Sequence, residues 1–185
     1  MYQKLCKLFL KLTGWKISGS FPTQLQFIAI VGPHTSNWDF IIGVIARGAL
    51  NVKINFLGKH QLFIPPWGWI FRAMGGAPVD RRKNNNLVDA AVQLFQNNPT
   101  FSLALTPEGT RSPVTRWKTG FYHIASQANI PIITVGLDFG RKTVIIAKEM
   151  STTDDMQQDM DKIIRFYRSI QGCHPKIIPD FSQEK

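Results

Sequence analysis

The sequence predicts one α/β domain with a largely parallel central sheet and helices on both faces. Short apolar segments alternate with amphipathic segments of helical length along the 185 residues, which is the order typical of strand, helix, strand units. The length is close to that of one domain, and 44% hydrophobic residues suffice for one core. No repeat, low-complexity tract or linker divides residues 1–185.

The first predicted element is a basic amphipathic helix within residues 1–16, ended by Gly14. Its lysines and its large apolar side chains lie on opposite faces: Lys4, Lys7 and Lys11 against Leu5, Leu8, Phe9 and Leu12. A helix of this kind suits the surface of a membrane, and it equally suits packing on its own domain.

The remaining elements follow in alternation. Strands are predicted at residues 26–31, 54–57, 101–105, 132–137 and 143–147. Helices are predicted at residues 38–50, 87–97, 120–129 and 153–170. Parallel strands end at one edge of a sheet, so the loops after residues 31 and 105 are the expected place for a site. The aromatic segment 63–71, FIPPWGWIF, fits an interfacial patch, an acyl-chain lining or core packing.

The charge balance indicates an anionic partner. The chain has 22 Lys and Arg against 12 Asp and Glu, a formal net charge of +10, which attracts a lipid surface, a phosphorylated substrate or nucleic acid. Nucleic acid is the least favoured of these, because no stacking platform or reader motif is present. Cys6 and Cys173 have no partners at metal-ligand spacing, so we expect reduced thiols, no metal and a cytoplasmic protein. No apolar run approaches the ~20 residues of a membrane span, and no secretory signal is visible.

The first candidate for chemistry is His34, which precedes Asp39 by five residues. A neutral imidazole accepts a proton near physiological pH when a carboxylate orients it. No GxSxG elbow supplies a protein nucleophile, so the attacking hydroxyl would belong to the substrate. The spacing alone is weak, because an isolated histidine before a helix is usually structural. Its place between a strand and a helix start strengthens the functional interpretation.

The second candidate is the loop Pro107-Glu108-Gly109-Thr110-Arg111-Ser112, which follows an apolar strand. Arg111 can bind a phosphate with two parallel hydrogen bonds. Glu108 can accept from an acceptor hydroxyl or brace Arg111. The alternative is an ordinary polar turn with an internal ion pair between Glu108 and Arg111.

Four blocks in order resemble the phospholipid/glycerol acyltransferases, a family that includes 1-acylglycerol-3-phosphate acyltransferase. His34-x4-Asp39 is similar to the HxxxxD motif of that family, and GGAPVDR at 75–81 is similar to its second block. PEGTRS at 107–112 matches the third block, and IPIITV at 130–135 is similar to the fourth. The resemblance covers about residues 26–138, and four ordered blocks are far more specific than any one of them.

The resemblance implies a role for each matching residue. His34 would be the general base, Asp39 its orienting partner and Arg111 the ligand of the acceptor phosphate. Lys59 would assist Arg111; the binding group would also include Arg81, Glu108, Gly109 and Thr110. For Lys59 and Arg81 the plain alternatives are a solvated basic surface or an internal ion pair.

The expected function is therefore O-acyl transfer from acyl-CoA or acyl-acyl carrier protein to the hydroxyl of a lysophosphatidate-like acceptor, with no bound cofactor. The expected place is an anionic membrane surface at the inner face of the cell membrane, with peripheral attachment. Two alternatives stay open: the same chemistry on another lysolipid or aminolipid, and a non-catalytic module that binds anionic lipid.

Overall fold

The computed structural model describes residues 1–79 and 87–181 and contains a seven-stranded sheet of order β1-β7-β6-β2-β5-β3-β4. The strands are β1 (Lys16–Ser18), β2 (Phe27–Gly32), β3 (Asn55–Lys59), β4 (Gly76–Val79), β5 (Ser102–Leu105), β6 (Ile132–Asp138) and β7 (Thr143–Ile146). The helices are α1 (Tyr2–Thr13), α2 (Asn37–Leu50), α3 (Gly68–Ala73), α4 (Leu87–Asn97), α5 (Gly120–Ala128) and α6 (Met156–Arg168), with a 3-10 turn at His60–Phe63.

The predicted fold class is confirmed. Strand β2 pairs in parallel with β5 and β6, and β3 pairs in parallel with β4 and β5. Only the β6 to β7 pairing is antiparallel among the described strands. The carboxyl ends of β2, β3 and β5 therefore meet at one edge of the sheet.

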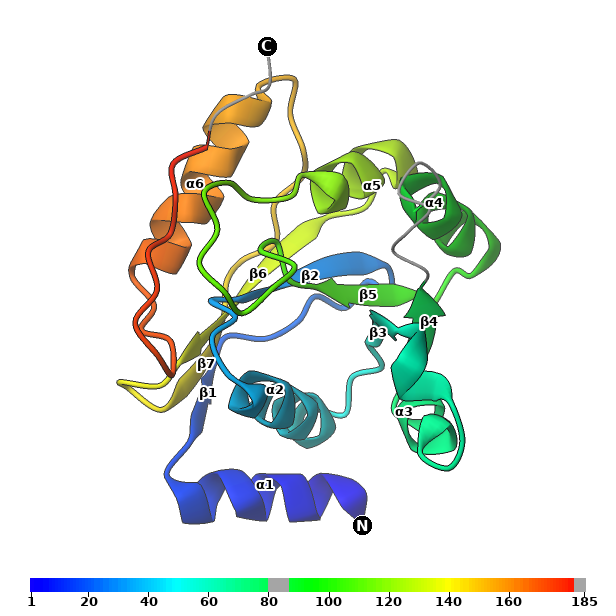
Figure 1. Ribbon diagram of the computed structural model, residues 1–185, viewed down its shortest axis with the longest axis vertical. Coiled ribbons are helices and arrows are strands. Elements are labelled where there is room, and N and C mark those ends of the chain that lie inside the picture. The colour runs from blue at the N-terminus through cyan, green and yellow to red at the C-terminus, as the bar shows by residue number, and fades with distance from the viewer. Residues whose placement is uncertain (80–86, 182–185) are drawn as a thin grey trace.

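Helices cover both faces of the sheet, as Figure 1 shows. Strand β2 alternates between two cores, because Ile28 and Ile30 pack under α4, α5 and α6 while Phe27 and Ala29 face α2. A strand that is buried on both faces has apolar residues at consecutive positions, which explains the apolar sequence FIAIV of β2. The loop that carries His34 thus follows a strand on which helices pack from both faces of the sheet.

Helix α1 packs on the outside of α2 through one narrow stripe (Figure 1). Cys6 and Leu10 are each 5% exposed, and Gln3 donates a hydrogen bond of 3.1 Å to Ala49 O. The predicted apolar face does not join the core: Leu5, Leu8, Phe9 and Leu12 are 36–77% exposed. The helix therefore packs on its own domain through Cys6 and Leu10. Its other large apolar side chains remain exposed to solvent.

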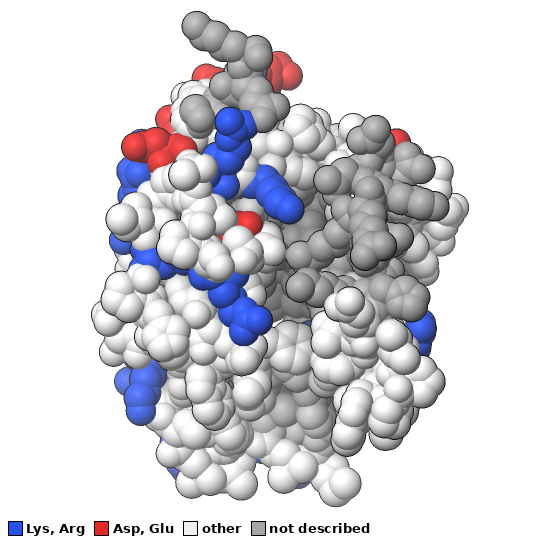
Figure 2. Space-filling view, in the orientation of Figure 1, with Lys and Arg blue, Asp and Glu red and all other residues white. Residues whose placement is uncertain are grey.

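The aromatic segment divides into a buried and an exposed part. Phe63 is 5% exposed, and the guanidinium of Arg72 lies 5.5 Å from the centre of its ring. Trp67 and Trp69 are 65% and 71% exposed, which excludes core packing for these two side chains. Figure 2 shows the surface over α3 almost without charge, whereas Lys and Arg gather on the side of α6. Within residues 1–79 and 87–181, no helix has the length and apolar character to cross a bilayer.

Several predicted bounds differ from the structure by one to three residues, and three short elements, β1, β4 and α3, were not among the predicted ones. Strand β1 was not predicted, because Lys16-Ile17-Ser18 has three residues and no apolar run. Helix α6 begins at Met156 rather than at residue 153, since Asp155 is its N-cap and accepts a 2.9 Å hydrogen bond from Gln158 N.

Candidate active site

Two loops meet at the carboxyl edge of the sheet. Strand β2 ends at Gly32 and leads to His34, while β5 ends at Leu105 and leads to Glu108. The two strands are paired neighbours, with Ile30 opposite Leu105. The predicted proximity of the two candidate loops is therefore correct.

His34 and Asp39 form a hydrogen-bonded pair. The distance from His34 Nδ1 to Asp39 Oδ2 is 3.0 Å, and the side chains are 25% and 4% exposed. An ionised carboxylate only accepts hydrogen bonds, so Nδ1 carries the proton and Nε2 presents its lone pair. This is the arrangement that a histidine general base requires.

Asp39 is held by the start of α2. Its Oδ2 also accepts from Thr35 N at 2.6 Å and from Ser36 N at 2.7 Å, which makes it the third helical residue of a capping box. The positive end of the helix dipole favours a carboxylate at this place. In the described part of the chain, Asp39 Oδ1 is buried and has no hydrogen-bond partner. The same carboxylate therefore caps the helix and fixes the imidazole.

Glu108 lies beneath the loop rather than at its surface. It is 2% exposed; Oε1 accepts from His34 N at 3.0 Å, and Oε2 forms an ion pair with Lys176. Both oxygens thus face groups of the protein. The expected contact of Glu108 with the acceptor or with Arg111 is replaced by a contact with the backbone of His34, which favours a positioning role.

The backbone at the edge of the site favours glycine at two points. Gly109 has φ of 66°, a left-handed conformation that other residues adopt at a cost. At Gly32, a Cβ would lie 3.1 Å from the Tyr167 ring and 3.6 Å from Glu108 Oε1. The absence of a side chain at Gly32 allows Glu108 and Tyr167 to approach the end of β2.

Arg111 lies at the mouth of the site. Its Nη1 donates to Asn37 Oδ1, at the first residue of α2, and the contact is exposed. The third-block loop is thereby joined to the helix that carries Asp39. Thr110 contributes its carbonyl oxygen to Lys176 at 3.0 Å.

The two other expected phosphate ligands are placed less fully. Lys59 is the last residue of β3, and β3 runs parallel to β5, so its backbone lies at the same edge of the sheet. Arg81 lies outside the described residues. The structure therefore brings together His34, Asp39, Glu108, Gly109, Thr110 and Arg111.

Lys176 is a residue of this site that sequence analysis missed. Its side chain is 3% exposed and contacts both candidate loops. It belongs to no motif, and its partner Glu108 is 68 residues away. The one signal was a single lysine within the otherwise apolar stretch PKIIP at 175–179.

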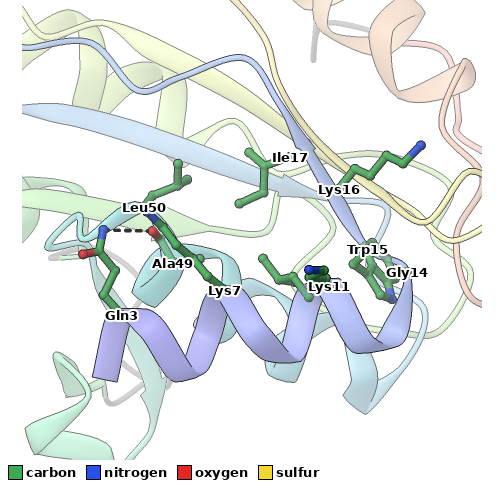
Figure 3. A pocket seen from close by; sticks show the side chains of 10 residues that line it. Gln3, Lys7, Lys11, Gly14, Trp15, Lys16, Ile17, Ala49 and Leu50 are labelled. Carbon is green, nitrogen blue, oxygen red and sulfur yellow. Dashed lines mark hydrogen bonds between the residues drawn. The ribbon is translucent and has the colours of Figure 1, made fainter. Parts of the chain in front are cut away.

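A separate cavity of about 570 Å³ lies beside α1. Apolar side chains that include Trp15 and Leu50 line it, together with three lysines: Lys7, Lys11 and Lys16 (Figure 3). None of the candidate site residues lines it. Among the described residues, no three His, Cys, Asp or Glu side chains are grouped as a metal site would require.

The family of the chain follows from comparison with known proteins. The family model described as Acyltransferase matches residues 18–138, a region that holds β2, β5 and both candidate loops. The chain belongs to the acyltransferase family. The blocks that carried the resemblance are thus part of a match that covers more than half of the chain.

Individual relatives agree with this family. The chain is 27% identical over 132 residues to a 1-acyl-sn-glycerol-3-phosphate acyltransferase of Haemophilus influenzae, which covers 67% of this chain and 54% of that protein. It is 29% identical over 145 residues to the enzyme of that name from Escherichia coli, covering 73% and 56%. The chain thus spans about half the length of these acyltransferases.

The fold also has a solved counterpart. The crystal structure of the 1-acyl-sn-glycerophosphate (LPA) acyltransferase PlsC from Thermotoga maritima matches with a TM-score of 0.62 at 18% identity. The match covers 91% of this chain and 76% of that one. At this identity the likeness concerns the fold.

Proposed function

We propose that the protein transfers a fatty acyl group from an acyl thioester to the hydroxyl of a lysophosphatidate-like glycerolipid, with His34 as the general base. The observation that carries the proposal is the His34 to Asp39 pair at 3.0 Å, in a member of the acyltransferase family. Arg111 donates a hydrogen bond to Asn37 on the helix that carries Asp39, which supports placing a phosphate ligand and the base in one site.

The reaction needs only groups that the site presents. Nε2 of His34 takes the proton of the acceptor hydroxyl as its oxygen attacks the thioester carbonyl carbon. The tetrahedral intermediate collapses, the carbon–sulfur bond breaks, and the thiol leaves with the proton from the imidazolium. Asp39 stabilises the imidazolium while it exists.

The acceptor and donor follow from charge and from the relatives. Arg111, with Lys59 and Arg81 as further ligands, would bind the acceptor phosphate by charge-assisted hydrogen bonds. The names of the bacterial relatives describe transfer to 1-acyl-sn-glycerol-3-phosphate. The donor in the proposal is acyl-CoA or acyl-acyl carrier protein, and no bound cofactor takes part.

The proposed place of reaction is an anionic membrane surface at the cytoplasmic side, with the protein attached peripherally. Helix α1 supports this, because it exposes Leu5, Leu8, Phe9 and Leu12 and also carries Lys4, Lys7 and Lys11. The exposed Trp67 and Trp69 provide a second apolar contact. A membrane is also where a lysolipid acceptor is found.

A mass-spectrometric assay with lysophosphatidate and acyl thioesters tests the function. We expect wild-type protein to form phosphatidate, and His34→Ala to lower kcat by about 10²- to 10⁴-fold, because the base is lost. His123→Ala is the matched control, since His123 is exposed on α5 and belongs to neither loop. Full activity of His34→Ala contradicts the mechanism.

Two other outcomes identify the alternatives. Product with a different lysolipid or an aminolipid, but none with lysophosphatidate, would keep the mechanism and change the acceptor. Binding to anionic vesicles without product or thioester consumption would indicate a lipid-binding module, with His34 in a structural role.

A further inference from the structure

The chain after α6 returns along the site. Residues 171–181 run back beside α6, drawn in red in Figure 1. Arg168 holds this segment with hydrogen bonds of 3.3 Å to Ile178 O and 2.7 Å to Asp180 Oδ1. His174 N donates to Thr35 Oγ1 at 3.3 Å, next to the catalytic histidine. The segment is therefore anchored at α6 and touches the loop that carries the base.

Lys176 carries the contact into the site. Its ammonium donates to His34 O at 2.9 Å and to Thr110 O at 3.0 Å, and it forms the ion pair with Glu108. An ammonium has three N–H donors, so all three are in use. Lys176 is consequently committed to the protein and is not a free ligand for the acceptor phosphate.

The ion pair holds the backbone of the base from both sides. Glu108 Oε1 accepts from His34 N at 3.0 Å, while Lys176 donates to His34 O. The side chains of Lys176 and Glu108 are 3% and 0% exposed. Removing two charges from water costs free energy, so a buried ion pair contributes little to stability. Its use here is to fix one geometry of the loops that it joins.

We infer that Lys176 is a positioning residue of the acyl-transfer site, which fixes the backbone of His34 relative to the loop of Thr110 and Arg111. The inference rests on the proposed function for the catalytic role of that geometry. Lys176 lies outside residues 18–138 that match the family model, so the C-terminal segment completes a site whose motifs lie far earlier in the chain.

The first variant is Lys176→Met, which keeps the length of the side chain and removes its three donors. We expect kcat to fall by about 10- to 100-fold, because a small displacement of a catalytic group has an effect of that size. The KM values for both substrates should stay within about threefold, since Lys176 does not touch either of them. A rise in KM with unchanged kcat overturns the inference.

A double variant separates positioning from folding. Lys176→Met leaves Glu108 as a buried charge without its partner, which can unfold the site by itself. Lys176→Met combined with Glu108→Gln removes both charges and keeps an oxygen for His34 N. We expect this protein to unfold near the wild-type temperature and still to lose kcat by about 10-fold or more. Recovery of wild-type kcat in the double variant overturns the inference.

Lys162→Met is the matched control. Lys162 also pairs with a buried carboxylate, Asp159, at 3.3 Å, but on α6 and among residues that do not contact the catalytic loops. We expect kcat within about twofold of wild type. An equal loss in this control overturns the inference, because it would trace the effect to general destabilisation.

Hydrogen exchange provides a readout that does not depend on activity. In the double variant, amides in residues 33–39 and 106–112 should exchange at least about fivefold faster than in wild type, because the backbone of both loops has lost its donor. Unchanged exchange overturns the inference. If wild-type protein forms no acylated product, the proposed function fails, and the exchange experiment still decides whether Lys176 fixes these loops.

Discussion

Asp39 serves a helix and an imidazole with one oxygen. Its Oδ2 accepts from two backbone amides of the capping box and from His34 Nδ1. Because the backbone donors restrain the carboxylate of Asp39, its hydrogen bond also fixes the orientation of the His34 imidazole. The structural and catalytic interpretations of the His34 to Asp39 spacing are therefore both supported by the same contacts.

Asp39→Asn tests this double role. We expect kcat to fall by about 10³- to 10⁴-fold, because an amide that donates to Nδ1 would favour the wrong tautomer. Stability should fall by about 1 kcal/mol through the weakened cap. Steady-state kinetics and urea unfolding measure the two effects.

Ser36→Ala separates cap from catalysis. Ser36 Oγ accepts from Trp38 N at 3.2 Å and does not contact the imidazole. A stability loss of about 1 kcal/mol with little change in kcat is expected. If Ser36→Ala loses as much kcat as Asp39→Asn, the loss would come from the disturbed helix cap and not from the contact between Asp39 and the imidazole.

Arg111→Ala tests the phosphate ligand. A charge-assisted hydrogen bond contributes about 1.5–3 kcal/mol, so KM for lysophosphatidate should rise about 10- to 100-fold. A monoacylglycerol lacks the phosphate, and activity on it should not change. Arg165→Ala, an exposed arginine on α6, is the control. If Arg111→Ala affected both acceptors equally, residues other than Arg111 would bind the phosphate head group.

The local part of the site could be predicted from sequence, and the long-range part could not. His34 and Asp39 are five residues apart, and His34 lies two residues before the capping box that contains Asp39, so the contact between them is local. Glu108 was identified as a site residue, but its role depends on Lys176, which only the folded chain brings close. No local pattern reports a partner 68 residues away.

At the scale of elements, α1 has two different faces. Cys6 and Leu10 pack on α2, whereas Leu8 and Leu12 are 50% and 77% exposed. Beside them, Lys7 and Lys11 line the cavity of Figure 3. A helix that is anchored by a narrow stripe and leaves an apolar face with lysines exposed is suited to the surface of an anionic bilayer.

A charge change on α1 tests this. Lys7→Gln combined with Lys11→Gln should weaken binding to phosphatidylserine-containing vesicles by about 30-fold, since each lysine contributes about 1 kcal/mol near such a surface. Co-sedimentation measures the binding. Lys53→Gln with Lys148→Gln removes the same charge from positions outside α1 and is expected to have a smaller effect. Equal losses in both pairs would indicate an effect of net charge alone.

Helices with a clear apolar stripe, such as α4, were predicted closely, while the edge of the sheet was not. Helix α4 has the predicted bounds of residues 87–97. Strand β1 escaped prediction because it has three residues with an exposed, half-buried, exposed pattern. Its pairing with β7 supplies the stabilisation that its own sequence lacks.

At the scale of the whole molecule, buried carboxylates connect stability to pH. Burial alone would raise the pKa of Asp159, but hydrogen bonds from Thr153 and Tyr122 and the contact with Lys162 outweigh it and lower that pKa. The pKa of Asp138 is likewise lowered, since hydrogen bonds from Arg141 and Gln171 outweigh burial. Both groups stabilise the fold above the unfolded pKa of about 3.9, and this contribution is lost as pH falls through the folded pKa.

We therefore expect the free energy of unfolding to decrease as the pH is lowered from about 5 towards 3. Asp159→Asn should be less stable than wild type by about 1–3 kcal/mol at pH 7, and the difference should narrow in acid. Urea unfolding at several pH values measures both. Asp89→Asn, an exposed position on α4, should change stability by less than about 0.5 kcal/mol. If the stability difference between wild type and Asp159→Asn became larger in acid, the pKa of Asp159 would be raised by folding and not lowered.

The strand order has a consequence for redesign of the protein. The base and its brace leave β2 and β5, which have neighbours on both sides, whereas Lys59 ends β3 and β4 forms the outer edge. In the proposed mechanism the base and the phosphate ligand Arg111 thus follow central strands, whereas the assisting Lys59 ends a strand nearer the edge of the sheet. An engineer who wishes to change the acceptor can vary the end of β3 and the chain after β4, and can leave the two central loops and the C-terminal segment that holds them untouched.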